Sequence, residues 1–191
     1  MTSANVTTAR PVYEAMLGRD RAWALSEGSR HFEGKSSVQD ALVKVARRLD
    51  ALGVSYAVAE GMALFRHGYR RFTDDVAILV AREGLAIIHD RLDGLGYLPP
   101  FTGSKNRRDT ENGVKIEFLI AGEYPGDGKP KPVAFPDPDQ AGVDLDGIRC
   151  LNVTYLVELK LASALTRVGA FKDLGDLQEL IKTLGLPRDF V

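Results

Sequence analysis

Two short runs of apolar residues constrain the fold of this chain more than any other feature of its sequence. Residues 54–59 and residues 76–80 each have the length and composition of a buried β-strand. A helical pattern precedes the first run, a short helical stretch separates the two runs, and another helical pattern follows the second. This alternation predicts an α/β protein in which helices flank a mixed, twisted sheet.

The helices are predicted from apolar residues that recur at helical spacing and from residues that favour helix ends. In the first of the central helices, Ser36 or Ser37 supplies the N-cap and Gly53 ends the helix. The last two helices form a C-terminal pair. The predicted helices are residues 38–52, 62–67, 83–95, 154–168 and 172–184, with one further short helix near residues 12–25.

Two dipeptides predict β-hairpins in the second half of the chain. Asn112-Gly113 is typical of a type I′ turn between antiparallel strands, and Asp146-Gly147 marks the turn of a second hairpin. Residues 114–120, which follow the first dipeptide, alternate as a strand with one buried face does. The proline- and glycine-rich residues 124–132 form a long loop, which we expect at the rim of a substrate cleft.

The predicted elements divide the chain into three segments. Residues 1–35 are an N-terminal extension, residues 36–152 are the α/β core, and residues 153–191 are a helical segment packed on that core. The total of 191 residues suits one compact domain with such a helical addition.

The overall charge is almost balanced, with 25 lysines and arginines against 26 aspartates and glutamates. This balance does not favour nucleic acid as a partner. The single cysteine, Cys150, excludes a disulfide framework and a cysteine zinc site. No apolar run approaches the roughly 20 residues that cross a bilayer, so we expect a cytoplasmic protein with no membrane association.

Two carboxylates are candidates for a shared site on the sheet. Asp75 begins the strand 75–80, and Glu117 lies within the strand 114–120. If these strands are neighbours, both side chains can point from one face, where paired carboxylates suit a hard cation such as Mg²⁺. The alternative is that Asp75 caps the start of its strand and Glu117 is a solvated charge at an edge.

The run from Tyr56 to Val80 resembles the core signature of the nucleotidyltransferase superfamily, which has the DNA polymerase β-like fold. It resembles in particular the small bacterial nucleotidyltransferase-like proteins that are related to abortive-infection toxins. In that family a strand ends in Gly-Gly or Gly-Ser, a short helix follows, and the next strand carries Asp-x-Asp. The resemblance extends over residues 26–186 and includes residues 114–135 and 172–176.

The resemblance implies a Mg²⁺-dependent enzyme that transfers a nucleoside monophosphate from an NTP to a hydroxyl acceptor. Two carboxylate-bound cations would orient the triphosphate and activate the hydroxyl. Asp75 matches the first metal-binding aspartate and Glu117 matches the third carboxylate, so both are implied catalytic and metal-binding residues. The implied nucleotide-binding residues are Gly61, Arg71, Thr73, Lys160 and Lys172. For the basic residues among them, the alternative is a solvated helix face.

Two positions depart from the family pattern. Ala77 stands where the second aspartate belongs, and a methyl group cannot bind a metal ion. Glu60 stands where the first glycine belongs, at the beginning of the short helix, and its carboxylate would compete with the anionic phosphates. Each change predicts severely weakened nucleotidyl transfer. An acid in the first turn of a helix is also stabilising by itself.

Three accounts of this pair agree with the sequence. The site has decayed, which leaves a pseudoenzyme that serves as a ligand- or protein-binding module. The two residues are deliberate inactivating substitutions. The third account is a relocated carboxylate, in which Glu60, Asp75 and Glu117 form a new acidic cluster for acid/base catalysis in a repurposed small-molecule enzyme.

Overall fold

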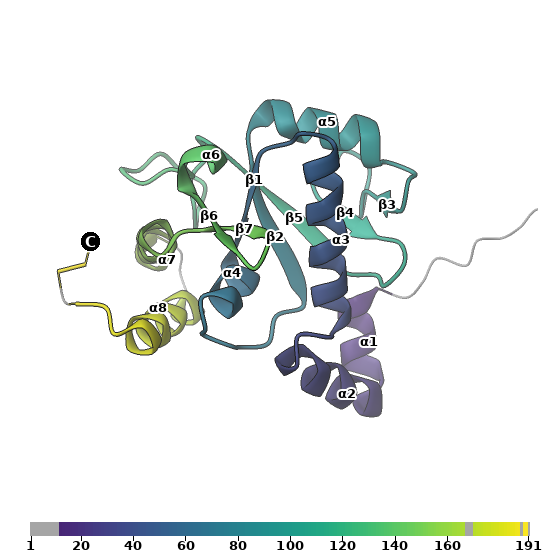
Figure 1. Cartoon of the computed structure of the whole chain (residues 1–191), viewed down its shortest axis with the longest axis horizontal. Helices are drawn as coiled ribbons and strands as arrows, with labels where there is room; N and C mark the ends of the chain where they lie inside the picture. The colour runs from purple at the N-terminus through teal and green to yellow at the C-terminus, as the bar shows by residue number, and fades with distance from the viewer. Residues whose placement is uncertain (1–11, 167–169, 188, 191) are drawn as a thin grey trace, which may run out of the picture.

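The computed structural model describes residues 12–166, 170–187 and 189–190 (Figure 1). Seven strands form one mixed sheet in the order β3-β4-β5-β2-β1-β7-β6. The strands are β1 (Tyr56–Ala59), β2 (Asp75–Val80), β3 (Tyr97–Leu98), β4 (Arg107–Asp109), β5 (Lys115–Ile120), β6 (Gly142–Leu145) and β7 (Ile148–Leu151). The helices are α1 (Tyr13–Arg19), α2 (Arg21–Phe32), α3 (Ser37–Ala51), α4 (Glu60–Arg66), α5 (Arg82–Leu92), α6 (Pro138–Ala141), α7 (Val153–Thr166) and α8 (Phe171–Leu184).

The centre of the sheet combines parallel and antiparallel neighbours. β2 runs parallel to β5 and antiparallel to β1, and β1 runs parallel to β7. The register pairs Ala77 of β2 with Ala59 on one side and with Glu117 on the other. These three positions therefore lie at one level across three adjacent strands, next to the point where β1 passes into α4.

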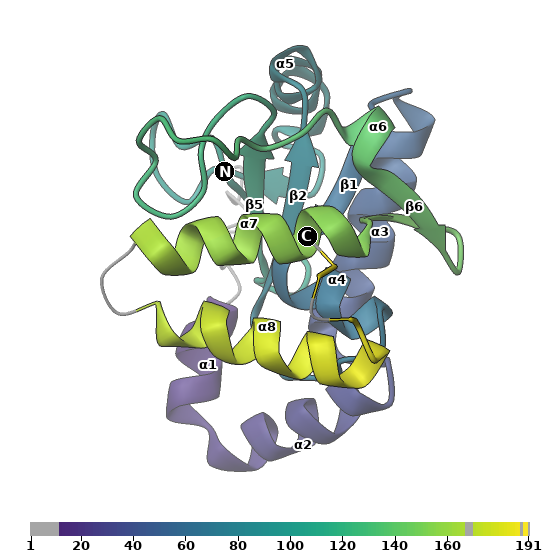
Figure 2. The same ribbon diagram turned by 90° about the vertical axis from the view of Figure 1, so that its left-hand side faces the viewer.

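Helices cover both faces of the sheet. Figure 2 looks onto the face that carries α7 and α8, and α3 lies on the opposite face. Because side chains alternate along a strand, β2 directs Val76, Ile78 and Val80 to the face opposite that of Asp75 and Ala77. All three of these apolar residues are fully buried, as are Leu42 and Leu49 of α3. Burial of this apolar surface is the main force that fixes α3 on the sheet.

The predicted α/β fold, with a mixed sheet and a C-terminal helical pair, is confirmed. The prediction of one helix near residues 12–25 is wrong, because the structure has α1 and α2 there. The chain is extended at Asp20, whose side chain accepts a hydrogen bond from the backbone N–H of Trp23 and so caps a second helix. Ser36, one of the two predicted candidates, is the N-cap of α3.

The two predicted hairpins exist, but they turn differently. Asp146 and Gly147 both have positive φ, 55° and 76°, as a type I′ turn requires. At the other hairpin, Gly113 alone has positive φ, and the loop between β4 and β5 runs from residue 110 to residue 114. The type I′ prediction for Asn112-Gly113 is therefore wrong, although the strands pair as expected. None of the helices in the described residues has the length and apolar content needed to cross a membrane.

Candidate functional site

A cleft of about 430 Å³ lies between the sheet and the helices α4, α7 and α8. The residues predicted for a site all line it, namely Glu60, Gly61, Arg71, Thr73, Asp75, Glu117, Lys160 and Lys172. Tyr124, Pro125, Gly126 and Gly128 also line the cleft, which confirms the expected position of the long loop. The structure thus brings together residues that are up to 112 positions apart in the sequence, counted from Glu60 to Lys172.

The sheet places Asp75 and Glu117 on the floor of this cleft, with the methyl group of Ala77 beside Glu117. The Thr73 hydroxyl donates a hydrogen bond of 3.0 Å to Oδ1 of Asp75. Burial raises the pKa of the Asp75 carboxyl, and the negative charges of Asp74 and Glu117 raise it further. Glu117 itself accepts a hydrogen bond of 2.8 Å from Nζ of Lys115 on the same strand.

This donor set does not fit the pair of magnesium ions that the family resemblance implies. A two-ion site needs carboxylates that bridge or flank both ions, and Ala77 removes the central one. Within the described parts of the chain, no three histidine, cysteine, aspartate or glutamate side chains are grouped so that they could hold a metal ion. Asp75 and Glu117 remain, and Glu117 is ion-paired with Lys115.

Glu60 adopts an unusual backbone conformation at the start of α4. Its φ of 51° lies in the left-handed region, which costs a residue with a Cβ atom about 1–2 kcal/mol. The next residue, Gly61, is packed so tightly that an added Cβ would lie 2.7 Å from Oγ1 of the buried Thr73. The sharp turn from β1 into α4 therefore uses a glycine-like conformation at one position and the absence of a side chain at the next.

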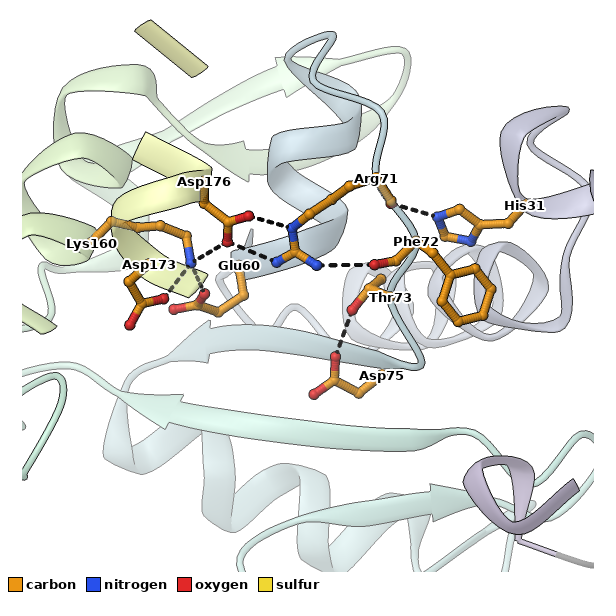
Figure 3. A network of polar contacts seen from close by, with 9 residues as sticks. All are labelled: His31, Glu60, Arg71, Phe72, Thr73, Asp75, Lys160, Asp173 and Asp176. Carbon is orange, nitrogen blue, oxygen red and sulfur yellow. Dashed lines mark hydrogen bonds and ion pairs between the residues drawn. The ribbon is translucent and has the colours of Figure 1, made fainter. Parts of the chain in front are cut away.

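The Glu60 carboxylate is bound to a buried lysine of α7. Nζ of Lys160 lies 2.5 Å from Oε2 of Glu60, 2.9 Å from Oδ1 of Asp173 and 3.0 Å from Oδ2 of Asp176 (Figure 3). The Lys160 side chain is 3% exposed. Although burial lowers its pKa, the three carboxylates more than compensate and raise the pKa above the ordinary lysine value.

The same network holds the second cation of the cleft, Arg71. Its Nε and Nη2 atoms lie 2.7 Å and 3.0 Å from the two carboxylate oxygens of Asp176, in a bidentate pair. Nη1 donates to the backbone oxygen of Phe72, and Ser163 donates to Oδ2 of Asp173 at 2.7 Å. Lys160 and Arg71 are therefore both bound to carboxylates of the chain itself.

Asp173 and Asp176 are site residues to which our interpretation of the sequence assigned no role, although the resemblance includes their segment. They follow the spacing i, i+3 and i+7 with the buried Leu180, so they lie on the inward face of α8. Two aspartates on the apolar face of an amphipathic helix are a signal of buried ion pairs, because an unpaired charge is costly there. The signal does not identify the partners, which come from α7 and from the segment before β2.

A buried histidine supports the backbone of Arg71 from the other side. His31 is fully buried, and its Nε2 lies 3.0 Å from the backbone oxygen of Arg71. Since a carbonyl oxygen can only accept, Nε2 carries the proton, and Nδ1 accepts from the Ser36 hydroxyl at 3.2 Å. Burial lowers the pKa of His31, which keeps the imidazole neutral.

No protein-family model and no curated protein sequence matches this chain. Solved structures do match it. The crystal structure of ANT(2″)-Ia in complex with adenylyl-2″-tobramycin has a TM-score of 0.53 at 13% identity, over 76% of this chain and 88% of that one. The solution structure of ANT(2″)-Ia gives 0.52 and 13%, over 77% and 84%. A putative nucleotidyltransferase from Thermotoga maritima gives 0.49 and 18%, over 75% and 91%. The likeness to the two ANT(2″)-Ia structures shows that the chain has the nucleotidyltransferase-like fold, as its residues predict.

Proposed function

We propose that this chain is a nucleotidyltransferase-fold protein in which Mg²⁺-dependent transfer of a nucleoside monophosphate from an NTP to a hydroxyl acceptor is severely impaired. Its cleft would instead bind a small molecule without a metal ion. One observation carries the proposal: the carboxylate of Glu60 lies 2.5 Å from the buried Lys160 ammonium. The Glu60 carboxylate therefore binds the Lys160 ammonium group, which a triphosphate would need as its own partner.

The electrostatics of the cleft support this proposal. Lys160 already has three carboxylate partners, and Arg71 is held by Asp176. A triphosphate would have to displace Glu60 and then lie close to a carboxylate that remains in the cleft. Two like charges 4 Å apart repel by about 4 kcal/mol at the effective dielectric constant of a protein surface. That repulsion alone is enough to weaken binding several hundredfold.

The sheet supports the same conclusion. Ala77 offers no oxygen, and Glu117 is ion-paired with Lys115. The cleft nevertheless has a volume of about 430 Å³, which is within the range of small-molecule sites. ANT(2″)-Ia holds adenylyl-2″-tobramycin in a chain of the same fold, which supports a small molecule as the occupant. A protein partner is the second candidate occupant.

A repurposed small-molecule enzyme is the second candidate function. Glu60, Asp75 and Glu117 all line one cleft, and burial raises the pKa of Asp75, which is the direction that favours a proton donor. Each of the three carboxylates has a different partner, however: Lys160, Thr73 and Lys115 respectively. The observation that favours this candidate is therefore the raised pKa of Asp75 alone.

Calorimetric titration with Mg²⁺ and each of the four NTPs tests the proposal. The unaltered chain should show no metal-dependent NTP binding at micromolar concentrations, and such binding would overturn the proposal. The variant with Glu60→Gly and Ala77→Asp should gain it if the altered pair is the cause. The matched control, Glu83→Gly with Ala86→Asp, makes the same two changes on α5 outside the cleft and should gain nothing.

A further inference from the structure

Asp75 differs from the other carboxylates of the cleft in having no ion pair among the described residues, although Lys115, its neighbour across the strands, attracts it electrostatically. The others are each ion-paired with a lysine, and they are Glu60, Glu117, Glu123 and Asp173. Among the residues that the structure describes, Asp75 has one side-chain partner, the neutral hydroxyl of Thr73. Among the described residues that line the cleft, Asp75 therefore carries the one negative charge that no ion pair neutralises.

The geometry leaves one oxygen of Asp75 available to a ligand. Thr73 donates to Oδ1, and no residue of the described chain donates to Oδ2. Figure 3 shows that this second oxygen points away from Thr73. A partly buried carboxylate with an open oxygen attracts a cation more strongly than an exposed one does, because water screens it less.

The surroundings of Asp75 are partly apolar. Ala77, Leu119 and Phe135 line the same cleft, and Ala77 and Leu119 follow Asp75 and Glu117 at strand spacing on the same face. In the family pattern a second aspartate would make this surface acidic. With alanine there, the floor offers one negative charge next to a hydrocarbon surface.

We infer that the cleft binds an organic primary ammonium ion that carries an apolar body. The ammonium group donates to Oδ2 of Asp75, and the hydrocarbon part packs against Ala77, Leu119 and Phe135. This inference rests on the proposed loss of metal and nucleotide binding at the same cleft. A monovalent ammonium matches a single carboxylate, whereas Mg²⁺ demands a nearly complete octahedron of oxygens.

The remaining charges of the cleft are compatible with such a ligand. Lys160 and Arg71 are each held by carboxylates and lie on the network shown in Figure 3 rather than beside Asp75. Lys115, opposite Asp75 on β5, is ion-paired with Glu117, and Lys105 is ion-paired with Glu123. Lys172 also lines the cleft, but its side chain is exposed, so water screens its repulsion of a cation.

Three probes with the same apolar body but different charge test the inference. They are the 2-phenylethylammonium ion, neutral 2-phenylethanol and anionic 3-phenylpropionate, each titrated by calorimetry into the whole chain. The ammonium ion should bind about ten- to a hundredfold more tightly than the alcohol, as expected for one charge-assisted hydrogen bond to a carboxylate. The anion should bind more weakly than both. Equal affinity for the ammonium ion and the alcohol would overturn the inference.

Two variants assign the effect to Asp75. Asp75→Asn keeps the shape and an oxygen that can accept from Thr73, and it should abolish the preference for the ammonium ion. Asp74→Asn removes the neighbouring charge, which does not line the cleft, and it should keep most of the preference. Equal loss in both variants would contradict a direct contact, and thermal unfolding shows that each variant is folded.

The titrations separate this inference from the proposed function. Micromolar binding of an NTP with Mg²⁺ overturns the proposed function, whatever the three probes do. Absence of NTP binding together with equal affinity for the ammonium ion and the alcohol overturns this inference alone. Tight binding of Mg²⁺ by itself that disappears in Asp75→Asn also overturns it, because Asp75 would then be a metal ligand.

Discussion

Replacement of Glu60 by glycine and by alanine separates its two effects on stability, which are the ion pair with Lys160 and the left-handed backbone conformation. Both variants lose the contact with Lys160. Because the Glu60 side chain is 43% exposed and Lys160 retains Asp173 and Asp176, we expect this loss to cost about 1 kcal/mol of unfolding free energy. Only glycine also relieves the left-handed backbone, where φ is 51°.

The backbone effect has two opposing parts. Relief of the left-handed strain favours glycine by about 1–2 kcal/mol. The greater freedom of glycine in the unfolded chain disfavours it by roughly 0.5–1 kcal/mol. Glu60→Gly should therefore be about 1 kcal/mol more stable than Glu60→Ala and nearly as stable as the unaltered chain.

Urea denaturation at neutral pH, followed by far-ultraviolet circular dichroism, measures these differences. A change of about 1 kcal/mol also moves the thermal midpoint of a chain of this size by roughly 2–4 °C. If Glu60→Gly is less stable than Glu60→Ala, the left-handed conformation of residue 60 is wrong, because both variants lose the same ion pair. If Glu60→Gly is several kcal/mol less stable than the unaltered chain, the low value given to the exposed ion pair is wrong. If the predicted order holds, the glutamate does not contribute enough stability to explain its presence at this position.

Three further changes test the packing and the charges around the cleft by the same denaturation assay. Lys160→Met removes the shared cation of three carboxylates and should cost about 3–5 kcal/mol, so a loss below about 1 kcal/mol would contradict the network. Gly61→Ala should cost about 1–3 kcal/mol by overlap with Thr73, whereas Gly175→Ala, with no atom within 4 Å of the new Cβ, should stabilise by about 0.5–1 kcal/mol. His31 has a pKa below its unfolded value of 6.5, so the folded chain binds fewer protons at this site than the unfolded chain does. Its contribution to stability is present above pH 6.5 and lost as the pH falls below that value, and His31→Gln should flatten this dependence.

The sequence predicts the parts of the fold that depend on local pattern. The period-two alternation around Asp75 and Glu117 correctly places both side chains on one face of the sheet. The glycine and aspartate at the second hairpin correctly predict its turn, because that conformation depends on two adjacent residues. The ends of α3, α4, α5 and α8 were predicted to within a few residues, since helix-end signals are local. The predicted end of the helix 154–168 lies outside the described residues.

The sequence does not predict the parts that depend on distant partners. Lys160 meets Asp173 across a pair of helices, and Arg71 meets Asp176 from a segment 105 residues away. Residue types alone indicate that some charges are buried, but many pairings satisfy that condition. The same limit explains why the carboxylate of Glu60 was predicted to join either the phosphate site or an acidic cluster, while its contact with Lys160 was not foreseen.

The two departures from the family pattern act on different walls of the cleft. Ala77 changes the floor formed by the sheet, and Glu60 changes the side formed with α7. Restoring an aspartate at position 77 would leave Lys160 bound to Glu60, and removing Glu60 would leave the floor without its central carboxylate. Each reversal thus corrects one of two independent obstacles to nucleotide binding. Because the two changes lie on separate walls, the cleft differs from the family pattern on both of them. In place of a metal-binding cluster, its floor has one carboxylate with an open oxygen, Asp75.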